Sequence, residues 1–211
     1  MKKLIILICI YGACVGSISA QTKSAQKDWQ LDNLMTINWQ IATPLSTNYL
    51  KGTSLAGGNF EYRRLIKPNM SVGIGFSWNS FEQYIPPKVY DRPDGSRQLY
   101  TDFVHQVYTL PMYLNAHYYF GGGDKLKPYA GIGLGAQYSE QSAYYNIFVT
   151  EDDNWGFVAR PEAGLLFRFS EYFGLHGNIG FSYATNKNEA LKIDELKHVY
   201  YNVGIYWNGS Y

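Results

Sequence analysis

Charged side chains occupy alternate positions in two segments that otherwise hold mostly apolar or neutral polar residues. Glu61 and Arg63 lie in one segment, and Arg160, Glu162 and Arg168 lie in the other. Residues two apart on an extended chain project to the same face, so each segment presents its charges on one face. Carboxylates and guanidiniums that face each other form charge-assisted hydrogen bonds. The five residues therefore predict an ion-pair network, which either fills the space between the segments or lines a narrow, gated path.

The histidines and serines form no pattern typical of a metal centre or a nucleophile. His105 and His117 share a face but lie twelve residues apart, too far along one strand to bind a single metal ion. His176 and His198 lie towards opposite ends of neighbouring segments. A catalytic serine needs a histidine beside it, whereas Ser182 and His176 are separated along one face of a single segment. The sequence predicts no catalytic residue, no metal site and no cofactor.

The segments that position these residues alternate apolar and polar positions with period two. The clearest one sets Met70, Val72, Ile74, Phe76 and Trp78 against Ser71, Gly73, Gly75, Ser77 and Asn79. Eight such segments follow residue 32; none contains a lysine, and none has a charge on its apolar face. An apolar outer face and a polar inner face are typical of a sheet closed on itself in a lipid bilayer. The pattern predicts an all-β fold, an eight-stranded antiparallel up-and-down transmembrane β-barrel.

A soluble barrel of the lipocalin type is the alternative fold. It predicts an apolar interior and a lysine-bearing exterior, whereas the lysines here stand in the leader, turns, loops and terminal stretches. After residue 20, no apolar run approaches the length of a spanning helix. Because a closed sheet satisfies every backbone group in lipid, the pattern favours the membrane barrel.

Residues 1–20 have the pattern of a secretory signal peptide. A charged start precedes an apolar stretch, and small residues follow up to Ala20. A retained helical anchor and a lipoprotein attached at Cys14 are the alternatives. Both cysteines lie in this leader, so the processed chain has no thiol and no disulfide. The predicted organisation is a removed signal peptide, a short periplasmic segment at 21–32 and the barrel at 33–211.

The connections between the segments alternate in length. Short, turn-forming links at residues 67–69, 121–127 and 170–171 separate longer stretches at 44–53, 81–98, 140–154 and 185–197. Short periplasmic turns and long extracellular loops are the layout of outer-membrane barrels. The layout places both chain termini in the periplasm.

Two of the long stretches are rich in apolar and aromatic residues and are candidate extracellular binding loops. The residues concerned are Tyr84, Ile85, Val89 and Tyr90 in the first stretch, and Tyr144, Tyr145, Ile147 and Phe148 in the second. Exposed apolar patches commonly mark binding surfaces. The alternative is that both stretches extend the strands above the membrane and pair with each other. The acidic run at residues 151–154 is either a solvated loop tip, a divalent-ion site or a bridge to lipopolysaccharide.

Two prolines and several aromatic residues refine the strand assignment. Pro111 and Pro161 lie within predicted strands, where each removes a ladder donor, so we expect local bulges there. Aromatic residues gather at the strand ends, with Trp78 and Phe81 at one rim and Phe120, Phe169, Trp207 and Tyr211 at the other. Two such rims are typical of interfacial girdles.

Composition excludes a nucleic-acid partner. The 211 residues have a formal net charge of +1, which provides no basic footprint for a phosphate backbone. The length suggests a single domain.

The chain resembles the small eight-stranded outer-membrane barrels of the OmpA/OmpX-like, porin-family type. The resemblance covers residues 33–211 and rests on the leader, the eight strands, the stretches 110–120 and 127–131, and the aromatic C-terminus. In such proteins the final strand ends in an aromatic residue, with apolar residues two and four positions earlier, and the insertion machinery recognises this signal. Trp207 and Tyr211 match the signal, and Gly209 departs from it.

The resemblance implies integral localisation in the bacterial outer membrane. The implied partners are membrane lipid, lipopolysaccharide and, during biogenesis, the barrel-insertion machinery. We expect a monomer that is not an enzyme, with a lumen plugged by polar side chains. Its role is structural or surface-binding, exercised through the extracellular loops towards an extracellular protein or another surface ligand. A narrow pore for ions or small solutes is the first alternative, and an enzyme that modifies lipid A is the second.

Overall fold

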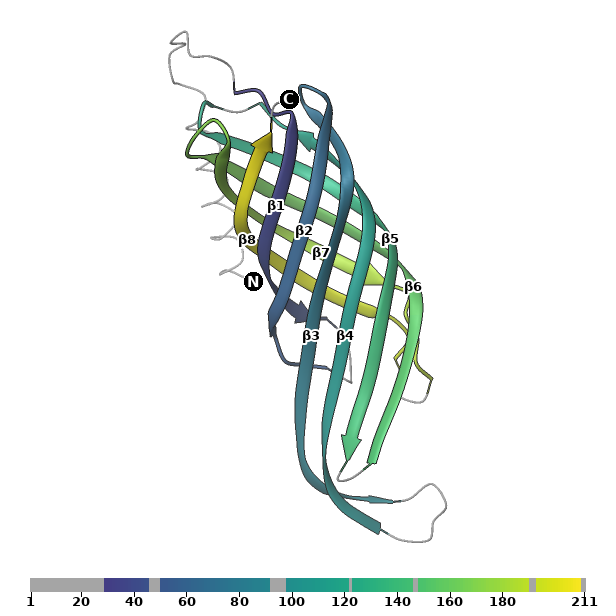
Figure 1. Ribbon diagram of the computed structural model, residues 1–211. Helices are drawn as coiled ribbons and strands as arrows, with labels where there is room; N and C mark the ends of the chain where they lie inside the picture. The colour runs from purple at the N-terminus through teal and green to yellow at the C-terminus, as the bar shows by residue number, and fades with distance from the viewer. Residues whose placement is uncertain are drawn as a thin grey trace, which may run out of the picture.

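The computed structural model describes residues 29–45, 50–91, 98–121, 123–145, 148–189 and 193–209. They form β1 (Asn33–Pro44), β2 (Ser54–Lys67), β3 (Met70–Asp91), β4 (Gln98–Tyr119), β5 (Leu126–Tyr145), β6 (Phe148–Arg168), β7 (Phe173–Ala184) and β8 (Leu196–Gly209). Each strand pairs antiparallel with the next, and β1 pairs with β8, which closes the barrel (Figure 1). The predicted eight-stranded antiparallel barrel is confirmed. The described residues include no helix with the length and apolar character needed to cross a membrane.

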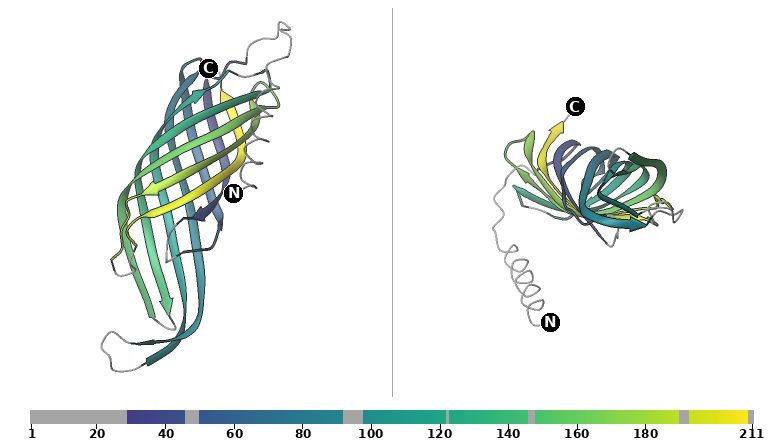
Figure 2. Two further views of the ribbon diagram at one scale, coloured as in Figure 1. Left: turned by 180° about the vertical axis from the view of Figure 1, so that it is seen from behind. Right: turned by 90° about the horizontal axis from the view of Figure 1, so that it is seen from below.

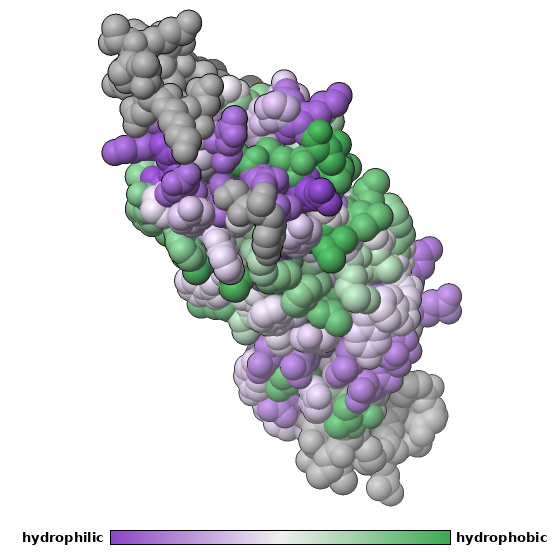
Figure 3. All heavy atoms as spheres, turned by 45° about the horizontal axis from the view of Figure 1, so that its top comes forward, coloured by the Kyte–Doolittle hydropathy of each residue, from purple (hydrophilic) through white to green (hydrophobic). Residues whose placement is uncertain are grey.

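Side chains alternate between the lumen and the outer surface, as the period-two pattern predicts. Along β1, Thr36, Asn38 and Gln40 are buried in the lumen, whereas Ile37 and Trp39 are 60% and 54% exposed on the outer face. In Figure 3, green apolar side chains gather across the middle of the visible face, and purple hydrophilic ones gather towards its two ends. An apolar band between polar ends matches a surface that contacts lipid.

The strands fall into two length classes. Strands β1, β2, β7 and β8 have 12 to 14 residues, whereas β3, β4, β5 and β6 have 20 to 22. A tilted strand of roughly 9–11 residues crosses a bilayer, so four neighbouring strands continue well beyond the barrel. Figures 1 and 2 show them extending from the end opposite the C-terminus. We call residues 81–91, 98–108, 140–145 and 148–153 the protruding sheet, and the end with the C-terminus the short-turn end.

The stretches predicted as binding loops are mostly strand. Tyr84 pairs with Val104, and Val104 pairs in turn with Tyr144 on β5. Only residues 92–97 remain between β3 and β4, and only residues 146–147 between β5 and β6. The loop assignment was therefore wrong. The alternative is right in that both stretches extend the strands, but they do not pair with each other, because β4 lies between them.

Lysines lie at the ends of several strands, contrary to the prediction that no strand contains one. Lys67, Lys127 and Lys197 each lie within two residues of a strand terminus, and Lys88 lies in the protruding part of β3. The barrel strands between these ends still lack lysine. A lysine at a strand end can reach the polar headgroups, whereas one at mid-membrane would be costly.

The two prolines inside strands each interrupt one ladder without shifting its register. The β3–β4 pairing has a gap at Pro111, and the β6–β7 pairing has a gap at Pro161, with the same register on both sides of each gap. Both prolines keep their partners on β5. The bulges expected at the prolines are therefore not present. The register shifts in the described ladders lie at residues 40–42, 65–67 and 85–88 instead.

Candidate functional site: a filled lumen and a protruding sheet

Glu61, Arg63 and Glu162 form an ion-pair cluster in the lumen. Arg63 contacts Glu61 on its own strand, with 2.6 Å between Nη2 and Oε2. It also reaches from β2 to Glu162 on β6, with 3.0 Å between Nη2 and Oε1. Its guanidinium lies 4.6 Å from the centre of the Tyr129 ring. The side chains of Glu61 and Arg63 have no solvent exposure, and buried charges require such partners because an unpaired one costs several kcal/mol.

Glu162 is the acceptor on which donors from four other strands converge. Besides Arg63, its carboxylate accepts hydrogen bonds from Nδ2 of Asn178 on β7 and from the hydroxyl of Tyr200 on β8, both at 3.1 Å. Its Oε1 lies 3.0 Å from Nε2 of His117 on β4. The contacts tie distant strands together across the lumen. Sequence reasoning treated His117 as an ordinary lumen residue and missed this contact, although its inward register placed it on the correct face.

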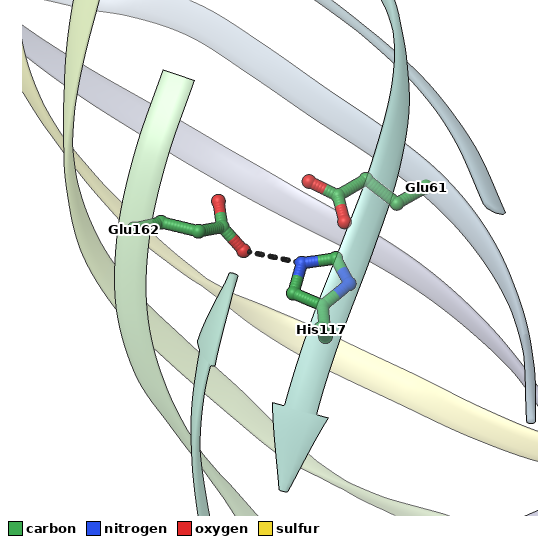
Figure 4. Close-up of side chains that lie close together, drawn as sticks. All are labelled: Glu61, His117 and Glu162. Carbon is green, nitrogen blue, oxygen red and sulfur yellow. Dashed lines mark hydrogen bonds and ion pairs between the residues drawn. The ribbon is translucent and has the colours of Figure 1, made fainter. Parts of the chain in front are cut away.

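Figure 4 shows Glu61, His117 and Glu162 directed towards one another. Their possible ligand atoms lie within 4.8 Å of one another, and among the described residues this is the one group of three that has such geometry. The guanidinium of Arg63 already contacts both carboxylates. We therefore assign the group to the ion-pair cluster, in which the cation is the protein's own side chain.

Arg160 forms a separate layer. It donates to Ser77 Oγ on β3 (2.8 Å) and to Gln40 Oε1 on β1 (3.0 Å). Its guanidinium carbon lies 4.1 Å from the centre of the Tyr200 ring and 5.0 Å from that of Tyr113. Neutral acceptors and aromatic faces thus hold this cation by hydrogen bonds and cation–π contact.

The structure does not join all five predicted network residues. Arg160 and Glu162 share a face of β6, but their contacts run to other strands. Arg168 lies at the short-turn end, 5.4 Å from the centre of the Trp29 ring. The prediction of a single network was wrong for Arg160, which is held by neutral groups and aromatic rings. It was also wrong for Arg168, because six residues along β6 separate it from Glu162 and place it at the mouth of the barrel.

Apolar clusters lie towards both ends of the lumen. The cluster at the short-turn end comprises Trp29, Leu31, Leu34, Tyr119, Tyr129, Leu166 and Tyr206. The cluster at the opposite end comprises Ala42, Leu50, Phe81, Val107, Val158, Ala184, Ile193, Leu196 and Tyr200. Phe81, expected in a girdle, is instead only 2% exposed, because its register on β3 points it inward. Between the clusters lie the carboxylates of Glu61 and Glu162 and the guanidiniums of Arg63 and Arg160, whose formal charges sum to zero.

The segment before β1 is fastened to the short-turn end. Trp29 stacks on Tyr206, with 6.2 Å between ring centres. Asn208 on β8 holds the segment through two hydrogen bonds: its Nδ2 donates to the Gln30 carbonyl (3.1 Å), and its Oδ1 accepts from the Asp32 N–H (3.0 Å). Residues 29–32 of the predicted periplasmic segment therefore pack against the barrel. The predicted signal peptide lies outside the described residues and stays a prediction.

Glycines on the inner face make room for tyrosine rings. A Cβ atom on Gly75 would lie 2.6–2.8 Å from three atoms of Tyr113, and one on Gly133 would lie 2.7 Å from the same ring. A Cβ on Gly164 would lie 2.6 Å from Tyr129. Real Cβ contacts are longer, so these positions require glycine as long as the rings stay in place. The space beside the inward-facing glycines is thus filled by tyrosine side chains from neighbouring strands.

The protruding sheet exposes several of the residues predicted for binding. Tyr84, Val89 and Tyr144 are 58%, 57% and 38% exposed, and Ile85 is half-buried. The side chains of Tyr90, Tyr145 and Phe148, and all of Ile147, lie outside the described part of the chain. Their binding role stays a prediction.

Of the predicted C-terminal insertion signal, Trp207 is described and Tyr211 is not. Trp207 is half-exposed on the outer face of β8 and stacks on Phe173 of β7, with 5.9 Å between ring centres. This position is consistent with an interfacial girdle. Recognition by the insertion machinery stays a prediction.

The chain is similar in fold to several solved outer-membrane proteins. Neisserial surface protein A shares 13% identity, over 84% of this chain and 97% of that chain, with a TM-score of 0.56. The attachment invasion locus protein Ail of Yersinia pestis, solved with the heparin analogue sucrose octasulfate, shares 14% identity over 85% of this chain and 99% of that chain (TM-score 0.50). The outer membrane protease OmpT of Escherichia coli shares 7% identity over 90% of this chain and 100% of that chain (TM-score 0.51). At these identities the likeness shows the fold alone.

A family model supplies the stronger assignment. The model of the outer membrane protein beta-barrel domain matches residues 11–205, whereas no curated protein matches the sequence. The match spans the whole closed barrel except the end of β8. The chain therefore belongs to the outer membrane protein beta-barrel domain family and is a small, eight-stranded integral protein of the bacterial outer membrane.

Proposed function

We propose that this protein is a non-conducting outer-membrane barrel that presents the protruding sheet to binding partners at the cell surface. The observation that carries the proposal is the length of β3 to β6, which have 20 to 22 residues against 12 to 14 in the other strands. A bilayer crossing uses about half of the longer strands. Because short turns face the periplasm in such barrels, we place the protruding sheet outside the cell.

The filled lumen supports the first half of the proposal. An eight-stranded barrel is only wide enough for side chains to fill its interior. Here the side chains of Arg63 and Arg160 cross that interior to Glu162, Ser77 and Gln40. Apolar clusters lie on either side of this polar layer. The arrangement argues against the pore alternative.

The surface of the protruding sheet supports the second half. Tyr100 is 71% exposed and Val149 is 52% exposed, alongside Tyr84, Val89 and Tyr144. Exposed apolar and aromatic side chains outside the membrane commonly mark a contact surface. A sheet that served only to close the barrel would not require them.

We also propose that the protein is not an enzyme, although one structural neighbour is a protease. In this chain, the two histidines that contact several lumen side chains are hydrogen-bonded to groups that fix their packing, and neither is hydrogen-bonded to a serine within the described residues. His176 contacts Tyr129 (2.5 Å) and Asn38 (2.6 Å), and His117 contacts Glu162. All three contacts lie inside the filled lumen, away from lipid, and both histidines are buried.

The proposal can be tested with a variant that lacks the tip of the protruding sheet. Residues 85–103 are replaced by Asn-Gly, which joins the paired residues Tyr84 and Val104 by a tight hairpin turn. Residues 141–152 are replaced by a second Asn-Gly, which joins the paired residues Glu140 and Asp153 and removes the exposed end of β6. Gram-negative cells that display either protein are tested for attachment to immobilised matrix proteins, heparin and epithelial cells. We expect attachment by the natural protein and its loss in the trimmed variant.

The control is a barrel with an intact sheet and a change at the short-turn end, Tyr172→Ser. Surface amounts are matched by blotting, and heat-dependent gel mobility checks that each barrel is folded. Undiminished attachment by the trimmed variant, or no attachment by the natural protein to any surface, would refute the proposal.

A further inference from the structure

The protruding sheet has two free edges that differ in their ability to accept another strand. The ladder between β2 and β3 ends at Ser80, so within the described chain the rest of β3 pairs with no strand on that side. This edge contains Pro86 and Pro87 and a register shift at residues 85–88. Proline and bulges are features by which proteins block pairing at edge strands. The β3 edge is therefore unsuited to strand addition.

The edge of β6 has unpaired backbone groups. The ladder between β6 and β7 ends at Val158. Next to it, the Phe157 carbonyl accepts from the Thr185 N–H (3.0 Å), and the Phe157 N–H donates to Thr185 Oγ1 (2.9 Å). Phe157 thus turns its backbone groups towards the β7 side. Backbone direction alternates along a strand, so residues 149, 151 and 153 turn theirs the same way.

The covering segment ends before these three residues. Asn154 donates to the Lys187 carbonyl (2.7 Å), and Asn186 donates to the Asn154 carbonyl (3.1 Å). Beyond Asn154, the described chain pairs residues 149–153 only with β5. Among the described residues, the N–H and C=O groups of Val149, Glu151 and Asp153 therefore have no strand partner on the β7 side.

The same edge concentrates negative charge. Glu151, Asp152 and Asp153 are exposed, and no ion pair to them is found within the described residues. Glu140 lies directly opposite Asp153 on β5, and like charges in that position are destabilising. A hydrogen bond from the Tyr138 hydroxyl to Asp153 eases this repulsion.

We infer that residues 149–153 of β6 accept an extended, basic segment of a partner protein as an added strand. The inference rests on the proposed surface-binding role and names the partner's chemistry. Main-chain hydrogen bonds to an exposed edge supply affinity in such complexes, and alternate side chains supply specificity. Lysines or arginines at alternate positions of the added strand would lie next to Glu151 and Asp153 and relieve their repulsion from Glu140.

A second copy of this chain does not fit the same edge. Antiparallel pairing of two β6 edges would place the carboxylates of one copy next to those of the other, and such juxtaposition costs affinity. The acidic edge therefore excludes self-association while it admits a basic strand.

The experiment uses the outer-membrane protein purified into nanodiscs of neutral phosphatidylcholine. Fluorescence anisotropy measures the binding of three peptides of equal length: alternating Lys and Thr, the same peptide methylated on the backbone nitrogen of each Lys, and alternating Glu and Thr. The N-methylated peptide keeps the charge, but the Lys backbone nitrogens that would face β6 have no hydrogen to donate. We expect binding of the Lys–Thr peptide alone, weakened by salt, together with slower hydrogen exchange of the Glu151 and Asp153 amides.

Two substitutions at one position separate charge from backbone pairing. Glu151→Gln removes the charge and keeps the N–H, and should weaken binding several-fold at low salt. Glu151→Pro removes both and should weaken binding by at least about tenfold. β6 already tolerates Pro161 at a position of the same backbone direction. The matched control is Glu82→Gln on the β3 edge, which should bind the peptide as the natural protein does.

Three outcomes would overturn the inference. They are equal binding of the Lys–Thr peptide and its N-methylated form, equal binding by Glu151→Gln and Glu151→Pro, and no binding of the Lys–Thr peptide at all. If cells still attach to a surface through the protruding sheet in these cases, the proposed function stands and only the strand addition fails. Loss of attachment by the trimmed variant tests the proposed function separately.

Discussion

At the scale of residues, the lumen depends on how a few buried charges are neutralised. Arg63 lies between Glu61 and Glu162 and contacts both, whereas Arg160 is held by neutral groups and aromatic rings. Breaking one partner of a buried ion pair is far more destabilising than removing both, because it leaves an uncompensated charge. The cluster therefore predicts strong coupling between Arg63 and Glu162.

Substitution of Glu162 by Gln should lower the free energy of unfolding by about 3 kcal/mol, and Arg63→Gln should do the same. The double variant should lose less than the sum of the two, since Glu162→Gln removes one of the two carboxylates that Arg63→Gln leaves without their cation. Urea unfolding in detergent micelles, followed by tryptophan fluorescence, measures all three. Arg168→Gln is the control, because Arg168 lies outside the cluster. Strictly additive losses would show that Arg63 and Glu162 are not coupled.

Gly75 tests whether the inner glycines are required by the rings beside them. Gly75→Ala places a methyl group within 2.8 Å of Tyr113, and overpacking of this kind costs about 1–3 kcal/mol. Gly123→Ala, where nothing lies within 4 Å of the added Cβ, should be neutral in the same unfolding assay. Equal stability of the two variants would mean that Tyr113 moves aside at little cost.

At the scale of elements, the segment before β1 acts on the seam at which the barrel closes. β1 and β8 are far apart in sequence, and their pairing is the last ladder of the ring. Trp29 stacks on Tyr206, and Asn208 binds the backbone on both sides of Leu31. These contacts join the chain before β1 to β8 on the inner side of the seam.

Trp29→Ala should therefore destabilise the folded barrel by about 3 kcal/mol, as expected when a large buried aromatic side chain is removed. Trp29→Phe, which keeps a ring against Tyr206, should recover most of the loss. The temperature at which the band of the folded barrel disappears on a gel ranks the variants by thermal stability. Trp155→Ala on the outer surface is the matched control, and a loss there as large as in Trp29→Ala would count against a specific role at the seam.

At the scale of the whole molecule, the barrel and the protruding sheet differ in how their strands are paired. The barrel has a closed ring of ladders and a filled interior, so it is a rigid base. The protruding sheet continues β3 to β6 without β2 or β7 beside it, so it has two edges. The β6 edge is acidic and, within the described chain, unpaired. Rigid bases with open edges at a distance suit contact with partners outside the membrane.

Planar-bilayer recordings of the folded protein should show no stable openings. Arg160→Gln should also remain silent, because the apolar clusters on both sides of the polar layer are unchanged. Heat-dependent gel mobility shows whether the barrel in each recording is folded. Openings whose size changes on neutralising Arg160 would instead make the lumen a conducting path.

The sequence by itself determined the features that follow from contact with lipid. Within the membrane each outward side chain must be apolar, so period-two alternation identified eight strands and the inward faces of Glu61, Arg63 and Glu162. Above the membrane both faces meet water, the alternation disappears, and the strands through Tyr84 and Tyr144 were mistaken for loops. Only the closed barrel decided that Arg63 crosses to Glu162 while Arg160 does not, because strand tilt and stagger set which inward side chains meet.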